Sequence, residues 1–449
     1  MSVIDLGDIN HLPDEPKGYP GRRRWPVRFR MSRLAKVATA VLAVLALGGS
    51  ALPGRPVLRE VWSTPVSDTE SWSVEQDTVF VQGTELTAYE LATGEVRWTR
   101  PVETGPSRVN VIARDGVLLL PGTEQSIDVT SGDVSAIGDA YSGSLTALDP
   151  ASGMRLWERP GSVSSEDTGD TLLMYERDPT ATMTWLRLVR VRDGSVVWER
   201  RAPEKADTVV VQFDGGAPAR VVTATRLGGL TVLRYADGAP LASGSVPWRT
   251  RSYATRSGSS LSAVDGRLVV VDLVLETSGD LSRVAVYRAG DLGLLWSREV
   301  PGYATLQDCG PLLCLTKNGE GFVEAVDPDT GEKRWEKPGF QLIGSAPGGE
   351  RLLVTGIDDK PTQTLVDTVT GRTIASDGSG ILLSVDEQEG AALLLRGVDP
   401  ATSVLSRLDT TTGKSTLLGR MSTGDLLCSG EDRWIACSAG GRLLVSTVG

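Results

Sequence analysis

Histidine is almost missing from this 449-residue chain, because the only one is His11, close to the N-terminus. Its scarcity excludes Ser-His-Asp and Cys-His nucleophile systems, histidine-ligated haem and the usual zinc sites from the rest of the chain. Acid–base chemistry there would depend on a carboxylate, a lysine or a tyrosine. Because the main body has no clustered carboxylates outside its turns and no adjacent cysteines, we predict no catalytic, cofactor-binding or metal-binding residues there.

Helical periodicity is also lacking between residues 57 and 449. Short runs rich in β-branched residues, such as Asp77–Val81 and Arg267–Val271, alternate with turn residues instead. With 40% hydrophobic and 23% charged residues, the composition is that of a globular protein. The length exceeds one ordinary compact domain unless that domain is a barrel, propeller or solenoid. The sequence therefore predicts an all-β fold.

Basic residues outnumber acidic ones only at the start of the chain. Residues 1–36 contain eight Lys and Arg against four Asp and Glu, whereas the whole chain has 46 basic and 57 acidic residues. The acidic remainder would repel a phosphate backbone, so we expect no nucleic acid as a partner.

Residues 34–52 form the longest apolar stretch, directly after the arginine-rich segment Arg22–Arg33. A stretch of this length is just enough to cross a bilayer as a helix if Lys36 extends its amine toward the surface. The positive-inside rule then keeps residues 1–33 in the cytoplasm as a flexible tail and exports residues 53–449. We predict a single-pass signal-anchor in the plasma membrane. A cleaved signal peptide is an alternative, because Gly49-Ser50-Ala51 resembles a cleavage site, and a buried helix is another.

One motif recurs from residue 57 onward, and its fullest copies are Ala147–Trp157 and Ala325–Trp335. The turn glycines follow one another at intervals of 38 to 59 residues if Gly293 is counted, although that copy is one residue shorter before its tryptophan. Such spacing with strands alone is typical of propeller blades. Glycine supplies the positive φ of a tight turn, and Asp or Thr side chains accept bonds from nearby amides. The repeat residues are Gly94, Trp98, Asp149, Gly153, Trp157, Gly194, Trp198, Trp296, Asp327, Gly331, Trp335, Asp367, Gly371, Asp409 and Gly413.

This motif resembles the PQQ-like repeat of a β-propeller family that includes quinoprotein dehydrogenases, BamB-like assembly propellers and sensor domains of bacterial kinases. The resemblance covers about residues 57–449 and implies a closed propeller with each tryptophan between neighbouring blades. Counting gives nine units, but similar propellers usually have eight blades. We therefore expect eight, within a range of seven to nine, with one incomplete unit around 103–161 or 203–248.

The two ends of the repeat region are complementary. Val57–Val66 resembles an outer strand without a preceding turn, and Asp425–Val448 resembles inner strands without an outer strand. Pairing them would close the ring and remove free sheet edges.

Only four cysteines occur, Cys309, Cys314, Cys428 and Cys437. Each pair falls where the first two strands of a unit meet, and an exported domain would fold in an oxidising compartment. We predict the disulfides Cys309–Cys314 and Cys428–Cys437. A redox or metal role stays open, although neither pair has C-x-x-C spacing.

The resemblance also implies what a quinoprotein enzyme would need, namely adjacent cysteines in a vicinal disulfide, a stacking tryptophan and calcium ligands. No two cysteines are adjacent here, so we expect neither PQQ nor enzymatic activity. The favoured function is a binding or scaffold module at the cell surface, whose partner is an unknown protein or cell-envelope ligand. A PQQ-dependent dehydrogenase and a sensor domain signalling through the anchor are the alternatives.

Overall fold

The computed structural model describes most of the chain after residue 57. The described residues are 58–67, 70–101, 111–122, 124–125, 128–131, 134–137, 141–164, 169–178, 182–214, 216–249, 258–276, 279–317, 321–346, 349–357, 362–386, 390–399, 402–422, 427–431 and 433–448. The predicted tail at 1–33 and the predicted anchor at 34–52 lie outside them. Within the described ranges, no helix has the length and apolar character needed to cross a membrane.

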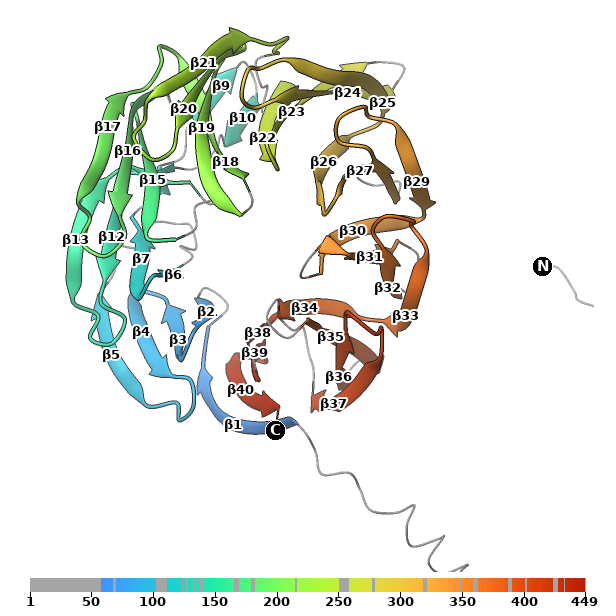
Figure 1. Cartoon of the computed structure of the whole chain (residues 1–449). Coiled ribbons are helices and arrows are strands. Elements are labelled where there is room, and N and C mark those ends of the chain that lie inside the picture. Colours follow the sequence, from blue (N-terminus) through green and yellow to red (C-terminus); the bar gives the residue numbers. More distant parts are fainter. Residues whose placement is uncertain are drawn as a thin grey trace, which may run out of the picture. The chain divides into compact units, whose positions relative to one another are not determined.

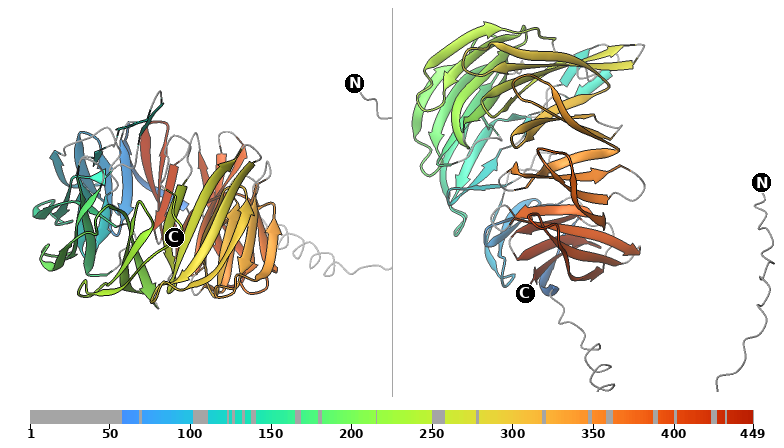
Figure 2. Two further views of the ribbon diagram at one scale, coloured as in Figure 1. Left: turned by 90° about the horizontal axis from the view of Figure 1, so that it is seen from above. Right: turned by 45° about the vertical axis from the view of Figure 1, so that its right-hand side comes forward.

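Nine four-stranded antiparallel sheets are arranged radially in the region of residues 56–449 (Figure 1). We number these blades 1 to 9 along the chain and give the strands of each from the inner to the outer one. Figure 2 shows from two further directions that the strands of successive blades stand side by side. The fold of the described residues is therefore an all-β propeller.

The strands of the first five blades have the following bounds. Blade 1 consists of β2 (Ser71–Glu75), β3 (Thr78–Gln82), β4 (Glu85–Glu90) and β5 (Val96–Pro101). Blade 2 consists of β6 (Ile112–Arg114), β7 (Val117–Pro121), β12 (Ser144–Leu148) and β13 (Arg155–Pro160). Blade 3 consists of β14 (Ser162–Val163), β15 (Thr171–Arg177), β16 (Met183–Arg190) and β17 (Val196–Arg201). Blade 4 consists of β18 (Ala206–Asp214), β19 (Ala217–Thr225), β20 (Gly229–Arg234) and β21 (Pro240–Ser245). Blade 5 consists of β22 (Gly258–Val264), β23 (Arg267–Glu276), β24 (Gly279–Arg288) and β25 (Leu294–Pro301).

The remaining four blades follow the same order. Blade 6 consists of β26 (Ala304–Cys309), β27 (Leu312–Lys317), β28 (Phe322–Val326) and β29 (Lys333–Pro338). Blade 7 consists of β30 (Phe340–Ser345), β31 (Arg351–Gly356), β32 (Thr362–Asp367) and β33 (Thr373–Ser379). Blade 8 consists of β34 (Ile381–Asp386), β35 (Ala391–Asp399), β36 (Thr402–Asp409) and β37 (Ser415–Ser422). Blade 9 consists of β38 (Leu427–Glu431), β39 (Trp434–Ala439), β40 (Arg442–Val448) and β1 (Leu58–Pro65).

The expected count of eight blades was wrong, because both units that we suspected of being incomplete form full sheets. Blade 2 contains an insertion between its second and third strands, where β8 (Glu124–Gln125) pairs with β11 (Tyr141–Ser142) and β9 (Asp128–Ser131) pairs with β10 (Val134–Ile137). This insertion lengthens the repeat without removing a strand. Blade 4 only lacks the tryptophan, and Ala242 takes its place opposite Val232.

The ring is closed by the two ends of the repeat region, as the sequence predicted. The strand β1 pairs antiparallel with β40, so that Trp62 lies opposite Val445 and Thr64 opposite Leu443. A cluster of buried apolar residues that includes Val79 of blade 1 and Leu443 of blade 9 fills the space between these two blades. Blade 9 is therefore built from both ends of the described chain.

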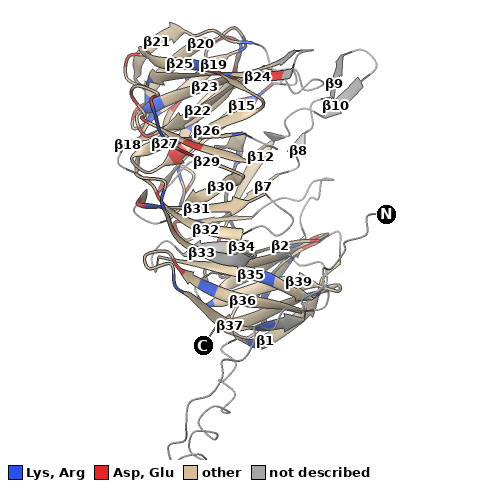
Figure 3. Cartoon of the chain, turned by 90° about the vertical axis from the view of Figure 1, so that its right-hand side faces the viewer, with Lys and Arg blue, Asp and Glu red and all other residues tan. Residues whose placement is uncertain are grey.

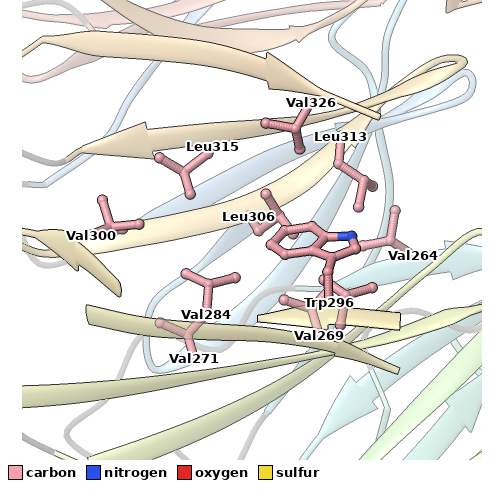
Figure 4. Packing of buried hydrophobic residues seen from close by; sticks show 12 residues of the cluster. Val264, Val269, Val271, Val284, Trp296, Val300, Leu306, Leu313, Leu315 and Val326 are labelled. Carbon is pink, nitrogen blue, oxygen red and sulfur yellow. The ribbon is translucent and has the colours of Figure 1, made fainter. Parts of the chain in front are cut away.

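The hydrophobic core lies between the blades. The second and third strands of the sheets are the most deeply buried, and every residue of β3 is buried, because its side chains meet a neighbouring blade on both faces. Figure 4 shows one such interface, in which Val269, Val284 and Trp296 of blade 5 pack against Leu313 and Leu315 of blade 6. Stability thus comes from repeated sheet-on-sheet burial rather than from one central core.

Candidate interaction surface and cavity

The repeat aspartates stabilise tight turns between the third and outer strands. Asp327 accepts hydrogen bonds from the amides of Asp329 and Thr330, at 3.1 and 3.0 Å. Arg334 also donates to Asp327 at 2.7 Å, and mainly for this reason the pKa of Asp327 is lowered to about 2. The other three predicted aspartates, Asp149, Asp367 and Asp409, accept amide hydrogens of their own turns. Each of the four therefore serves a different blade, and they form no shared site.

The repeat tryptophans and glycines meet across the blade junctions. At six junctions the indole of one blade lies against the turn glycine of the next, and its Nε1 donates to the carbonyl three residues before that glycine, at 2.7–3.0 Å. A Cβ on these glycines would lie only 2.6–2.9 Å from the ring. We call this arrangement the tryptophan clasp. Its pairs are Trp62 with Gly94, Trp98 with Gly153, Trp157 with Gly194, Trp198 with Gly238, Trp296 with Gly331, and Trp335 with Gly371.

The turn of blade 5 departs from the sequence expectation. Leu292, not Gly293, has the positive φ of 60° and donates its amide to the Arg288 carbonyl, as the turn glycines do in other blades. Leu292 stands four residues before Trp296, so the copy that looked one residue short has the normal length. The matching outer strand of blade 4 has Ala242 instead of a tryptophan. An indole could not lie over a residue with a side chain, and the two replacements therefore belong together.

Two further junctions lack the clasp for other reasons. Between blades 7 and 8, Ala375 approaches Gly413 so closely that an added Cβ would lie 2.3 Å from that of Ala375. Between blades 8 and 9, no tight turn exists for an indole to cover, because the third and outer strands of blade 9 come from opposite ends of the chain. The buried clusters at these two junctions are largely aliphatic.

An arginine two residues after the tryptophan adds a second contact at three clasped junctions. Arg100 donates to the Gly153 carbonyl at 2.9 Å, and Arg159 donates to the Gly194 carbonyl at 2.5 Å. Arg200 makes the equivalent bond to Gly238. The sequence analysis missed this role, although the pattern Trp-x-Arg is visible in all three strands.

Both predicted disulfides are present. Cys309 at the end of β26 is bonded to Cys314 in β27, and Cys428 is bonded to Cys437, its directly opposite partner on β39. All four cysteines are therefore committed to bonds between residues five and nine positions apart. A site of the quinoprotein kind needs a vicinal pair, so the cysteines present do not fit PQQ. Among the described residues, no group of three or more His, Cys, Asp or Glu is placed to hold a metal ion.

The outer strands of blades 1 to 5 carry exposed apolar side chains at a recurring place. Each lies two or three residues after the positive-φ residue of the turn, and their exposed fractions are between 38% and 56%. In blade 6 the same two places hold Lys333 and Arg334, which pair with Glu336 and Asp327. Figure 3 shows the side of the ring that lies to the right in Figure 1, around β29 and β33, where charged residues of both signs are scattered. We call the following set the outer apolar row: Val96, Leu156, Val196, Val197, Leu241 and Leu294.

A cavity of about 200 Å³ lies between blades 1 and 2. Its apolar lining includes Phe80 of blade 1 and Ala113, Val117, Leu118 and Pro150 of blade 2. Spacing and periodicity contain no signal for such a cavity, because it depends on how two sheets fit together.

Acidic groups gather at one edge of this cavity. Arg97 is held by Asp77, with Nη2 and Oδ2 2.8 Å apart, and lies 3.6 Å from Glu90. The hydrogen bond from Arg97 is the main cause that lowers the pKa of Asp77, which keeps this carboxylate ionised. Glu75 also lines the cavity. Two carboxylates, those of Asp77 and Glu90, therefore flank the guanidinium of Arg97.

The geometry defines a propeller of repeats that are joined by glycine turns and tryptophan clasps. The family model described as outer membrane protein assembly factor BamB matches residues 59–181 and 168–337. These matches cover more than half of the chain, so the chain belongs to this BamB-like family. No curated protein sequence matches it.

Several solved propellers are similar to this chain. BamB from Moraxella catarrhalis is 14% identical, with 87% of this chain and 99% of that chain covered and a TM-score of 0.41. A europium-containing methanol dehydrogenase is 12% identical, with 86% and 85% covered and a TM-score of 0.41. The C-terminal WD40 domain of Sif2 is 9% identical, with 87% and 98% covered and a TM-score of 0.43. At such scores, none of these likenesses carries a conclusion about function.

Proposed function

We propose that this chain is a membrane-anchored, extracytoplasmic propeller that acts as a protein-binding or scaffold module. The observation that carries the proposal is the outer apolar row. Single exposed apolar residues are common on protein surfaces, but here they recur in five successive blades at one or other of two adjacent positions of the outer strand, which is not random scatter. A partner that lies along the rim would remove these side chains from water.

The repeat architecture supports such a role. Within one blade, the tight turn, the inner strands and the tryptophan of the outer strand serve stability, whereas the exposed side chains of the outer strand can change without loss of the clasp. The outer strands of blades 1 to 5 are apolar at these positions, whereas that of blade 6 is charged. The two ends of the row therefore differ, which would let a partner bind in one orientation.

The proposed location follows from the sequence. The apolar segment 34–52 would act as the anchor, the arginine cluster would keep residues 1–33 in the cytoplasm, and the two disulfides suit an oxidising compartment. The partner would then be a protein or another component of the cell envelope, not a nucleic acid. Neither a dehydrogenase nor a sensor is favoured by a specific contact in the propeller.

Site-specific photocrosslinking in intact cells tests the proposal. A photoreactive amino acid at Val96, Val196 or Leu241 should give discrete crosslinked species, whereas the same probe at Lys333 in blade 6 should give none. Failure of all three row positions to crosslink would overturn the binding role. Turnover of alcohols or aldoses by the full chain with PQQ and calcium would overturn it in favour of the dehydrogenase.

A further inference from the structure

The outer strand of each blade is an edge strand, because among the described residues no further strand pairs with its outward side. The N–H and C=O groups on such an edge can pair with a strand of another chain. Charged side chains on the strand hinder this pairing, and a proline removes one of the donors. The sequences of the nine outer strands therefore indicate how well each edge is protected.

Eight of these nine strands contain at least one charged residue. Directly after the clasp tryptophan, blades 2, 3 and 6 have Glu158, Glu199 and Glu336. Three residues after the tryptophan, blades 1, 2 and 6 have Pro101, Pro160 and Pro338. Most edges are thus protected in the same two places.

The outer strand of blade 4, β21, has neither kind of protection. It contains no charged residue, and the two places are occupied by Ser243 and Ser245. All of its residues are exposed except Ala242, which is partly buried. Its proline, Pro240, stands at the first position and leaves the rest of the edge open. Figure 1 shows β21 at the outer rim of the ring.

The backbone of β21 alternates between its inner and outer sides. Val246 donates its amide to the Gly228 carbonyl and is therefore directed inward. Since consecutive residues of a strand direct their N–H and C=O groups to opposite sides, Ser243 and Ser245 direct theirs outward. A β-bulge before Ala242 and Pro247 after the strand limit the regular edge to this short stretch.

We propose that β21 pairs antiparallel with β21 of a second copy of this chain, across a two-fold axis at Gly244. In this register Ser243 of each copy lies opposite Ser245 of the other, and each such pair exchanges two hydrogen bonds. Gly244 meets its own equivalent at the axis, where the absence of a side chain permits close approach. The inference concerns assembly and goes beyond the proposed scaffold function.

Charge favours a second copy as the occupant. The whole chain has a net charge of −11, so two copies repel each other over most of their surfaces. An outer strand with charged residues that paired with itself would also bring like charges together, which destabilises a sheet. The uncharged β21 avoids this cost. Because the other edges are protected, the pairing closes as a dimer and does not extend into a filament.

The mass of the full chain in detergent micelles tests the pairing, measured by light scattering after size-exclusion chromatography. We expect a dimer that dissociates on dilution. Ser245→Pro and Ser243→Glu should each raise the dissociation constant at least tenfold, because they remove an outward amide or bring carboxylates to the axis. Both give β21 residues that other blades have at these places, so the fold should tolerate them. The matched control is Ser297→Glu, at the same place in blade 5, which should leave the dimer unchanged.

Disulfide crosslinking tests the register. All four natural cysteines are in disulfides, so an introduced cysteine is the only thiol. A mixture of the Ser243→Cys and Ser245→Cys chains should crosslink on mild oxidation far more than either variant alone. Directly opposite residues have Cα atoms about 5.5 Å apart, within reach of a disulfide, whereas diagonal ones are about 7–8 Å apart.

A monomer at every concentration would overturn the inference, as would equal weakening of the dimer by Ser297→Glu and Ser243→Glu. A mixture that crosslinks no better than the single variants would overturn it too. These outcomes leave the scaffold function untouched, because crosslinks from Val96 or Val196 to a different protein do not depend on β21.

Discussion

Two junctions between blades cover the tight turn with different side chains. They are the junction of blades 2 and 3 and the junction of blades 4 and 5. At the first, Trp157 lies over Gly194 and donates to the Val191 carbonyl. At the second, Ala242 replaces the tryptophan and Leu292 replaces the glycine. The comparison teaches that the contact joins two consecutive copies of the repeat. A side chain at the turn position excludes an indole in the preceding blade, whereas a glycine there does not require one, since Gly413 lies against Ala375.

Removal of a clasping indole should have the largest effect. We expect Trp157→Ala to lower the free energy of unfolding by about 3–5 kcal/mol, since it deletes a buried aromatic side chain and leaves a cavity. Urea denaturation of the full chain followed by circular dichroism measures the loss. Trp185 on β16 is partly exposed and covers no turn glycine, so Trp185→Ala should cost clearly less. Equal losses in the two variants would contradict the importance of the clasp.

A side chain at the turn glycine should act next most strongly. Gly153 has a φ of 68°, and an added Cβ would lie 2.6 Å from Trp98, so Gly153→Ala combines backbone strain with a clash. We expect a loss of about 2–4 kcal/mol. Gly116 has a similar φ of 72° but open space around it, so Gly116→Ala isolates the backbone strain, about 1–2 kcal/mol. Thermal unfolding of both variants gives the difference, and identical shifts would argue against contact with the ring.

Two substitutions, studied as a double-mutant cycle, can convert the junction between blades 4 and 5 into one with a tryptophan clasp. Ala242→Trp alone should destabilise, because the indole meets Leu292, and Leu292→Gly alone should lose the packing of Leu292 on Gly244. Together they should restore at least part of the loss, with a favourable coupling of about 1 kcal/mol. Urea unfolding of the four proteins measures the coupling. Simple additivity would mean that the two replacements are unrelated.

The repeat aspartates that accept hydrogen bonds in the tight turns should make the smallest contribution to stability, and lowering the pH should reveal it. The pKa of Asp327 is lowered from 3.8 to about 2, chiefly by Arg334, so its stabilising effect is complete above pH 4 and disappears as the pH falls toward 2. Asp327→Asn and Arg334→Gln should each reduce the loss of melting temperature between pH 5 and pH 2.5. The effect should be modest, because the pair is open to solvent. An unchanged pH dependence in both variants would rule out this ion pair as a contributor.

Much of the fold could be predicted from the sequence, because local turn chemistry repeats wherever a blade repeats. Asp327 through Trp335 contains all the information for one turn and one outer strand. The blade number could not be obtained that way, since the insertion at β8–β11 and the missing tryptophan at Ala242 change the spacing and the motif without removing a strand. The usual blade number of similar propellers then led us to expect eight blades, although counting the units in the sequence gave nine.

The candidate site was beyond sequence reasoning for a different reason. Whether Val196 is exposed or Ala113 borders a cavity depends on the fit of neighbouring sheets, which one strand does not encode. Leu292 was misread because glycine at the next position offered the usual turn residue, while a leucine with positive φ is rare. The outer apolar row is visible in the sequence as apolar residues just before the tryptophans. The sequence of one strand does not show, however, which of these residues a neighbouring blade buries and which face the solvent.

The strand pairing that joins Leu58 to Val448 sets an order of events for a newly made chain. The strand β1 is synthesised before all the other described strands and its partner β40 after them, so the whole propeller sequence must exist before the two can meet. Local hairpins can form early, whereas this long-range contact is entropically the most demanding and should form late. A chain that stops short of residue 442 would leave β1 as an unpaired edge open to proteases and aggregation. The seam between β1 and β40 therefore works as a test of completeness of the propeller, passed only by chains translated through β40.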